Sequence, residues 1–131
     1  MTLEYSGNLR STGDVQGLCE KLARFMVELT VEGAAVFPPG GVRVRAIPCD
    51  EFSIADGSLA DAAFAHAILK IGAGRSDVAK RATADGLFGI IKDHFGNLFE
   101  TQGLALSLEL SEFSESGTLK HNNLHFRLKK P

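Results

Sequence analysis

Three arginines and a glycine turn are the residues of this sequence best suited to chemistry on an anion. Residues 68–71 are typical of an apolar strand, and Gly72-Ala73-Gly74-Arg75-Ser76 follows them. Ser76 is suited to cap a helix, which places Arg75 where a guanidinium and backbone N–H groups can bind the same carboxylate. A turn of this kind is equally typical of a tight strand–helix connection that binds nothing.

The glycine–arginine–serine pattern occurs twice in the chain. The matched residues are Gly7, Arg10 and Ser11 in the first copy and, 65 residues later, Gly72, Arg75 and Ser76 in the second. A helical stretch follows each copy, and after it a strand that begins at a glycine, Gly41 or Gly103. The repeat predicts two β-α-β units, and two copies are too few for a solenoid.

Residues 42–47 alternate apolar and basic side chains, which predicts a half-buried strand with Arg43 and Arg45 on one face. Arg43, Arg45 and Arg75 are therefore candidates for binding carboxylates and for stabilising an enolate. The alternative is that one of the two strand arginines forms a structural ion pair, with Asp56 or Glu109.

The hydrophobic pattern predicts an α+β fold in which two β-α-β units form a four-stranded mixed sheet with two helices on one face. We expect a single domain over residues 1–131, with repeat halves at about 2–49 and 62–112 and a C-terminal tail over 113–131. The expected helices span 14–31 and 76–99, and the expected strands span 2–6, 42–47, 62–71 and 104–110. Residues 50–61 are expected to be a loop, with Asp56-Gly57 suited to a hairpin turn.

Three further expectations concern packing and assembly. Gly86 and Gly89, inside the second helix, indicate close packing against the sheet, because glycine otherwise weakens a helix. The apolar strand 104–110 would leave hydrophobic surface on the uncovered face of the sheet, which predicts that the protein forms an oligomer. His121 and His125 flank Asn122-Asn123 in a tail that is expected to dock on a neighbouring subunit.

The composition restricts the class of protein. Hydrophobic residues make up 44% and charged residues 23%, as in globular domains. A net charge of −2 argues against nonspecific nucleic-acid binding, and the apolar runs are too short to span a membrane. Cys19 and Cys49 show neither metal-ligand spacing nor a disulfide framework, so we expect a cytoplasmic protein without a metal or other cofactor.

The aromatic and histidine residues have two interpretations each. Phe37 and Phe52 are candidates for an apolar wall of a substrate pocket, although most phenylalanines belong to the core. His66 lies in an apolar strand, where a histidine is more often a hydrogen-bonded core residue than a catalyst.

With these residues identified, the chain resembles the 5-carboxymethyl-2-hydroxymuconate isomerases of the tautomerase superfamily over nearly its whole length. The resemblance is carried by residues 4–9, 41–45, 55–57, 64–66, 69–76, 91–95, 104–109 and 122–125. It implies a tautomerase/MIF-like fold and a homotrimer. It also implies a cofactor-independent isomerase that shifts a proton in 5-carboxymethyl-2-hydroxymuconate or a similar unsaturated 2-hydroxy or 2-oxo carboxylate, in the catabolism of aromatic compounds.

The resemblance fails at the catalytic base. Members of this family begin with a proline whose secondary amine is the general base and then the acid, and the pattern places Pro, His and an apolar residue ahead of Thr2. Met1 stands in the place of that apolar residue. Either the sequence starts a few codons inside the true start, or the protein is a diverged member.

The α-amine of Met1 is the nearest substitute base. It lies out of register, however, so we expect the chain as written to lose most activity. The alternative function is a non-catalytic trimeric module that binds small anions.

Overall fold

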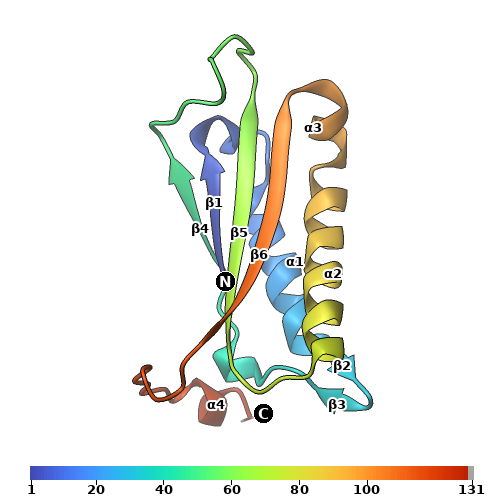
Figure 1. The fold of residues 1–131 in the computed structure, drawn as a ribbon, viewed down its shortest axis with the longest axis vertical. Helices are drawn as coiled ribbons and strands as arrows, with labels where there is room; N and C mark the ends of the chain where they lie inside the picture. Colours follow the sequence, from blue (N-terminus) through green and yellow to red (C-terminus); the bar gives the residue numbers. More distant parts are fainter. Residues whose placement is uncertain (130–131) are drawn as a thin grey trace.

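The computed structural model describes residues 1–129, which form a four-stranded mixed sheet in the order β4-β1-β5-β6 with helices against it (Figure 1). The strands are β1 (Thr2–Ser6), β4 (Arg45–Cys49), β5 (Ala63–Gly72) and β6 (Leu104–Phe113). The outer pairs β1–β4 and β5–β6 are parallel, whereas the central pair β1–β5 is antiparallel. The predicted α+β fold with a mixed four-stranded sheet is therefore confirmed.

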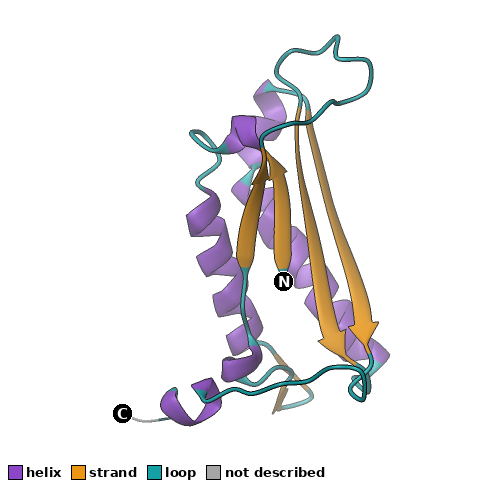
Figure 2. Ribbon diagram, turned by 90° about the vertical axis from the view of Figure 1, so that its left-hand side faces the viewer, coloured by secondary structure: helices purple, strands orange, loops and turns teal. Residues whose placement is uncertain are grey.

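Each half of the chain contributes one β-α-β unit, as the repeat predicts. Helix α1 (Val15–Glu28) connects β1 to β4, and α2 (Asp77–His94) connects β5 to β6. The two helices lie side by side on the same face of the sheet (Figure 2). The core between these layers is apolar and draws on both units, with Leu3, Leu18, Leu22, Ala67, Leu87 and Ile91 completely buried.

The leucines of β6 point toward the helices. Leu104, Leu106, Leu108 and Leu110 pack against the core, and in the β5–β6 register they stand beside the buried residues Ala63, Ala65, Ala67 and Leu69. The open face of β6 instead carries Ala105, Ser107 and Glu109. The expectation that β6 would expose an all-apolar strand is therefore wrong, because the period of two places every leucine on the covered side.

The first helix is shorter than the residues 14–31 that were predicted. Asp14 is its N-cap and its carboxylate accepts a hydrogen bond from the Gly17 N–H, but the helix ends at Glu28. Strand β2 (Thr30–Val31) then pairs with β3 (Ala34–Ala35). Glu32 and Gly33, between these strands, both have positive φ, as a two-residue hairpin turn requires.

The second helical segment is divided at Phe95. Helix α2 ends at His94 and α3 (Gly96–Thr101) begins two residues later, whereas a single helix over 76–99 was expected. Phe95 is buried in the core with ψ near 12°, and Gly96, a weak helix former, follows it. The N-terminus of α2 agrees with the prediction, since the Ser76 hydroxyl accepts a hydrogen bond from the Ala79 N–H.

The connections place the ends of the strands differently from the prediction. Strand β4 begins at Arg45 rather than at residue 42, and β6 continues three residues past Leu110. A turn does form around Asp56-Gly57, where the Asp56 carboxylate accepts a hydrogen bond from the Ser58 N–H. It is not a hairpin, because β1 lies between β4 and β5 in the sheet.

The C-terminal tail returns to the first half of its own chain. Helix α4 (Leu124–Arg127) packs against the 3₁₀ turn η2 (Pro39–Gly41), and the Asn122 side-chain amide donates a hydrogen bond to the Gly40 carbonyl. The prediction placed this tail on a neighbouring subunit. Within residues 1–129, no helix is both long and apolar enough to cross a lipid bilayer.

Gly86 faces the neighbouring helix rather than the sheet. A Cβ atom at Gly86 would overlap three ring atoms of Phe25 on α1, whereas a Cβ at Gly89 would meet nothing within 4 Å. The expectation that both glycines permit packing against the sheet is therefore wrong. Gly86 permits α1 and α2 to approach each other, and Gly89 is not needed for packing.

This difference predicts opposite effects of two alanine substitutions. Gly86→Ala should lower the free energy of unfolding by about 1–2 kcal/mol, because the Phe25 ring must move. Gly89→Ala should raise it by up to about 1 kcal/mol, because alanine is the better helix former and no atom stands in its way. Urea unfolding of the two variants measures both effects, and an equal change in the two would contradict the assignment.

Candidate active site

A cavity of about 700 Å³ opens at the end of the sheet where β1 and β4 begin and β5 ends. The antiparallel pairing of β1 with β5 brings these ends together, and the C-terminal tail passes below them (Figure 1). Residues 118–125 of this tail line the cavity. The charged or titratable groups that line the cavity are Met1, Arg43, Arg45, Lys70, Arg75, Glu115, Lys120, His121 and His125.

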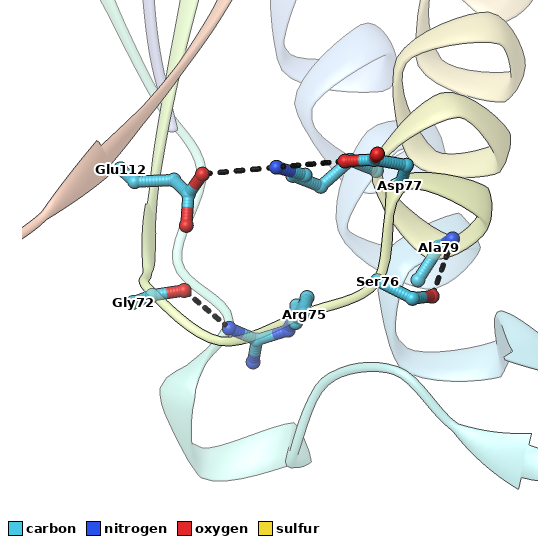
Figure 3. Close-up of polar contacts among 7 residues, drawn as sticks. Gly72, Arg75, Ser76, Asp77, Ala79 and Glu112 are labelled. Carbon is cyan, nitrogen blue, oxygen red and sulfur yellow. Dashed lines mark hydrogen bonds and ion pairs between the residues drawn. The ribbon is translucent and has the colours of Figure 1, made fainter.

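Arg75 is held in place by its surroundings. Its Nε donates a hydrogen bond to the Val36 carbonyl at 3.0 Å, and its Nη1 donates to the Gly72 carbonyl at 3.2 Å (Figure 3). The guanidinium also stacks over the Phe37 ring, 4.6 Å from the centroid. Its Nη2 has no protein partner among the described residues. The bound side of the guanidinium thus fixes its orientation, and the free N–H groups can receive a carboxylate.

Arg45, the first residue of β4, and Arg43, two residues before it, line the same cavity. Both side chains are exposed, and in the described part of the chain neither forms an ion pair. The proposed ion-pair partners are engaged elsewhere, since Asp56 binds the Ser58 N–H and Glu109 lies 3.5 Å from His66. The structure therefore does not support the alternative that one of these arginines forms a structural ion pair with Asp56 or Glu109.

The first residue of the chain ties the start of β1 to both arginines. The Met1 α-amine donates a hydrogen bond to the Arg43 carbonyl at 2.8 Å, and the Arg45 N–H donates to the Met1 carbonyl at 3.1 Å. Burial, followed by the charges of Arg45 and Arg43, lowers the pKa of the Met1 amine from its usual value near 8. More of this amine is therefore neutral, and able to accept a proton, near pH 7 than is usual.

The cavity is strongly positive. Among the described residues, five lysine and arginine side chains line it, and Glu115 is the one carboxylate. Glu115 is itself bound to Lys120, with Oε2 and Nζ 3.0 Å apart. An excess of cations around a cavity favours an anionic ligand, and guanidinium groups are suited to carboxylates in particular.

The two candidate phenylalanines lie far apart. Phe37 is buried, lines the cavity and supports Arg75. Phe52 is 40% exposed and packs edge-to-face on Phe64, near the opposite end of the sheet. It does not line the cavity, because the loop after β4 carries it away from the strand starts. Phe52 is therefore wrongly placed by the sequence analysis.

Two other residues named from the sequence lie outside the cavity. Arg10, the repeat counterpart of Arg75, is exposed and lies 3.3 Å from Asp50. His66 stands on the open face of the sheet, where its Nδ1 is 2.6 Å from the Ser107 hydroxyl. His66 thus has hydrogen-bonding partners, as expected, although it is partly exposed rather than in the core.

The sequence analysis missed Lys70 and Lys120 as cavity residues. Lys70 follows Leu69 in an otherwise apolar strand and is exposed, so it could have been noticed as a break in the pattern. Lys120 gave no such signal, because its position depends on how the tail folds back over Gly72. Among the described residues, no group of three or more potential metal ligands occurs.

Comparison with known proteins agrees with this fold and cavity. The sequence model of the family described as 5-carboxymethyl-2-hydroxymuconate isomerase matches residues 1–128. The 5-carboxymethyl-2-hydroxymuconate Delta-isomerase of Escherichia coli is 39% identical over 123 residues, which is 94% of this chain and 93% of that protein.

Solved structures show the same similarity. The crystal structure of a 5-carboxymethyl-2-hydroxymuconate isomerase from Deinococcus radiodurans R1 has a TM-score of 0.89 and 44% identity, covering 98% of this chain and 92% of that one. A crystal structure of a 5-carboxymethyl-2-hydroxymuconate delta-isomerase has a TM-score of 0.89 and 29% identity, and the match covers 99% of this chain and 92% of that chain.

The mixed sheet with two helices on one face is the fold of the tautomerase superfamily, to which the solved isomerases named above belong. Within that superfamily, the chain belongs to the 5-carboxymethyl-2-hydroxymuconate isomerase family. The resemblance seen in the sequence is thereby confirmed.

The Met1 amine gives a direct test of the electrostatics in the cavity. Replacing the nearby positive charge in Arg45→Gln should raise the pKa of the amine toward its usual value, because a neighbouring cation no longer disfavours the charged form. The measurement is the pH dependence of the acetylation rate at Met1, read by mass spectrometry. Arg24→Gln, an exposed arginine on α1, is the control, and an equal shift in both variants would contradict the proposed cause.

Proposed function

We propose that the cavity is the active site of a cofactor-independent isomerase acting on 5-carboxymethyl-2-hydroxymuconate or a similar unsaturated 2-hydroxy or 2-oxo carboxylate. The observation that carries this proposal is the meeting of Arg43, Arg45 and Arg75 with a chain-terminal amine of lowered pKa in one cavity. Family membership supports the same reaction class. The corresponding cellular role is the catabolism of aromatic compounds, and we assign the protein to the cytoplasm.

The reaction needs one group to carry the proton and others to hold the charge. A neutral amine removes the proton of the 2-hydroxyl group, which leaves a dienolate whose negative charge spreads along the conjugated carbons. The resulting ammonium then returns the proton to a carbon at the far end of the conjugated system, and the double bonds move accordingly. The starting and final molecules differ only in the position of this proton and the double bonds.

The arginines bind the substrate and stabilise its charge. We assign the free side of the Arg75 guanidinium to a carboxylate or to the developing enolate oxygen, because its orientation is fixed before the substrate arrives. Arg43 lies beside the amine and is assigned to the same catalytic group. Arg45 is assigned to a second carboxylate, and Phe37 to the wall that supports Arg75.

The position of the base decides between an enzyme and a binding module. Continuing the β1–β4 register backward from the Thr2–Arg45 pair would place two additional residues beside Arg43 and Val42, both of which line the cavity. A proline amine at that point would lie deeper in the cavity than the Met1 amine. Without it, the arginines still bind small anions, which is the alternative function.

The open face of the sheet supports assembly of identical subunits. We propose that the chain is a single domain and forms a homotrimer, with this face buried between subunits. The face carries Ile47, Phe64 and Ile68, three apolar side chains that the helices do not cover. Charged side chains lie among them, since Glu4 stands between Ile47 and His66 in the register and Glu109 stands beside Ile68.

Isomerase activity should depend on the identity and register of the first residue. A variant in which Pro-His-Leu precedes Thr2, in place of Met1, should isomerise 5-carboxymethyl-2-hydroxymuconate ~100-fold faster than the chain as given. A matched variant beginning Ala-His-Leu has the same register but a primary amine, so it separates the two causes. Ultraviolet absorbance follows the loss of the dienol.

Each outcome of this comparison has a defined meaning. Equal rates for the given chain and the proline variant would show that the proline is not needed. No activity from any of the three, together with retained binding of carboxylates, would favour the binding module.

Assembly is tested by sedimentation velocity at micromolar concentration. The protein should sediment as a trimer, and Ile47→Glu should shift it toward the monomer because a buried charge at the interface is costly. Val78→Glu is the matched control, since Val78 is an exposed apolar residue on α2, away from the sheet face. A monomeric parent protein would contradict the trimer.

A further inference from the structure

The C-terminal tail places one lysine–glutamate pair at the cavity wall beside Arg75. Strand β6 ends at Phe113, and the tail then passes Gly72 before its helix reaches η2. A Cβ atom at Gly72 would overlap one oxygen of the Glu115 carboxylate, and the other oxygen is 3.0 Å from Lys120 Nζ. Lys120 also lies over the Phe113 ring, 5.0 Å from its centroid.

These contacts connect Lys120 to Arg75 through one turn of the backbone. The Gly72 carbonyl accepts a hydrogen bond from Arg75 Nη1, while Glu115 sits against the Gly72 Cα and binds Lys120. The turn at Gly72 therefore has Arg75 on its carbonyl and the Glu115–Lys120 pair beside its Cα, so a carboxylate of the protein already lies next to Lys120 at this edge of the cavity. A carboxylate of a ligand is chemically suited to the same place.

We propose that Lys120 is a specificity-determining residue that binds an additional carboxylate of the substrate, with Glu115 occupying that place when the substrate is absent. The proposal rests on the proposed function, because it assumes that Arg43, Arg45 and Arg75 bind the other carboxylates. It assigns to Lys120 the preference for an acid with three carboxylates over an acid with two. The Glu115–Lys120 pair is more than half exposed, so exchanging its carboxylate for that of a ligand costs little.

The tail is attached firmly enough to position this lysine. The Asn122 amide donates a hydrogen bond to the Gly40 carbonyl, and the Asn122 side-chain oxygen accepts one from the Leu124 N–H. His125 packs on Gly40, where a Cβ would come within 2.6 Å of its Nδ1. Residues 122–125 are therefore held against η2, while Lys120 itself lines the cavity wall.

The test compares binding of a tricarboxylate and a dicarboxylate by titration calorimetry, so that its readout does not depend on catalysis. The probes are tricarballylate and glutarate, saturated acids that cannot isomerise. Lys120→Gln should weaken tricarballylate binding about 5- to 10-fold and glutarate binding less than about 2-fold, the gain from a charged hydrogen bond being reduced by the lost Glu115 pair. Glu115→Gln should strengthen tricarballylate binding up to about threefold, because it removes the competing carboxylate.

Lys80→Gln is the matched control. Lys80 is also a lysine 3.0 Å from a glutamate, Glu112, near the same end of the sheet, but it does not line the cavity. It should leave the binding of both acids unchanged, and melting temperatures should show that all variants are folded.

Three results would overturn the assignment to Lys120. The first is that Lys120→Gln weakens the binding of tricarballylate and of glutarate equally. The second is that Lys80→Gln loses as much tricarballylate binding as Lys120→Gln. The third is that Glu115→Gln binds tricarballylate more weakly than the parent protein. If the parent protein binds glutarate and only the Lys120 result fails, the proposed function stands. If the parent binds neither acid, the carboxylate cavity itself is wrong and both proposals fall.

Discussion

The antiparallel pairing of β1 with β5 is the constraint on which the site depends. Thr2 stands opposite Ile68, so the beginning of the chain is placed beside the last residues of β5 and the turn that carries Arg75. The parallel pairing of β1 with β4 adds Arg43 and Arg45 at the same end. A shift of this register by one residue would turn Leu3 and Tyr5 out of the core, so the packing that stabilises the fold also fixes the site.

The parts of the fold predicted correctly from sequence are those with a local physical cause. The Ser76 cap, the glycine turn at Gly74 with φ of 110° and the two β-α-β units follow from residue type and hydrophobic period. The errors arise where tertiary contacts decide. Phe95 is placed by the core and interrupts a helix that its neighbours favour, and Gly86 is explained only by the Phe25 ring on the other helix.

The same distinction applies to the site. Arg43, Arg45 and Arg75 could be named from sequence because each belongs to a strand or turn whose direction is predictable. Phe52 was misplaced because it lies in a loop that leads away from the cavity, and Lys120 was missed because the tail has no periodic pattern. The tail returns to the cavity through contacts of Asn122 and His125 with Gly40, which link residues more than 80 positions apart.

In the proposed reaction, the positive charge of the cavity would serve carboxylate binding and proton transfer together. Burial and the charges of Arg45 and Arg43 keep the Met1 amine more often neutral, and the same guanidinium groups attract carboxylates. An anion bound between them offsets their charge, so the amine becomes a stronger base when the cavity is occupied. Orientation comes from elsewhere, since Phe37 and the carbonyls of Val36 and Gly72 hold the Arg75 guanidinium. The groups that orient Arg75 are therefore different from the charges that lower the pKa of the Met1 amine. A substitution that changes the pKa of the amine need not change the orientation of Arg75.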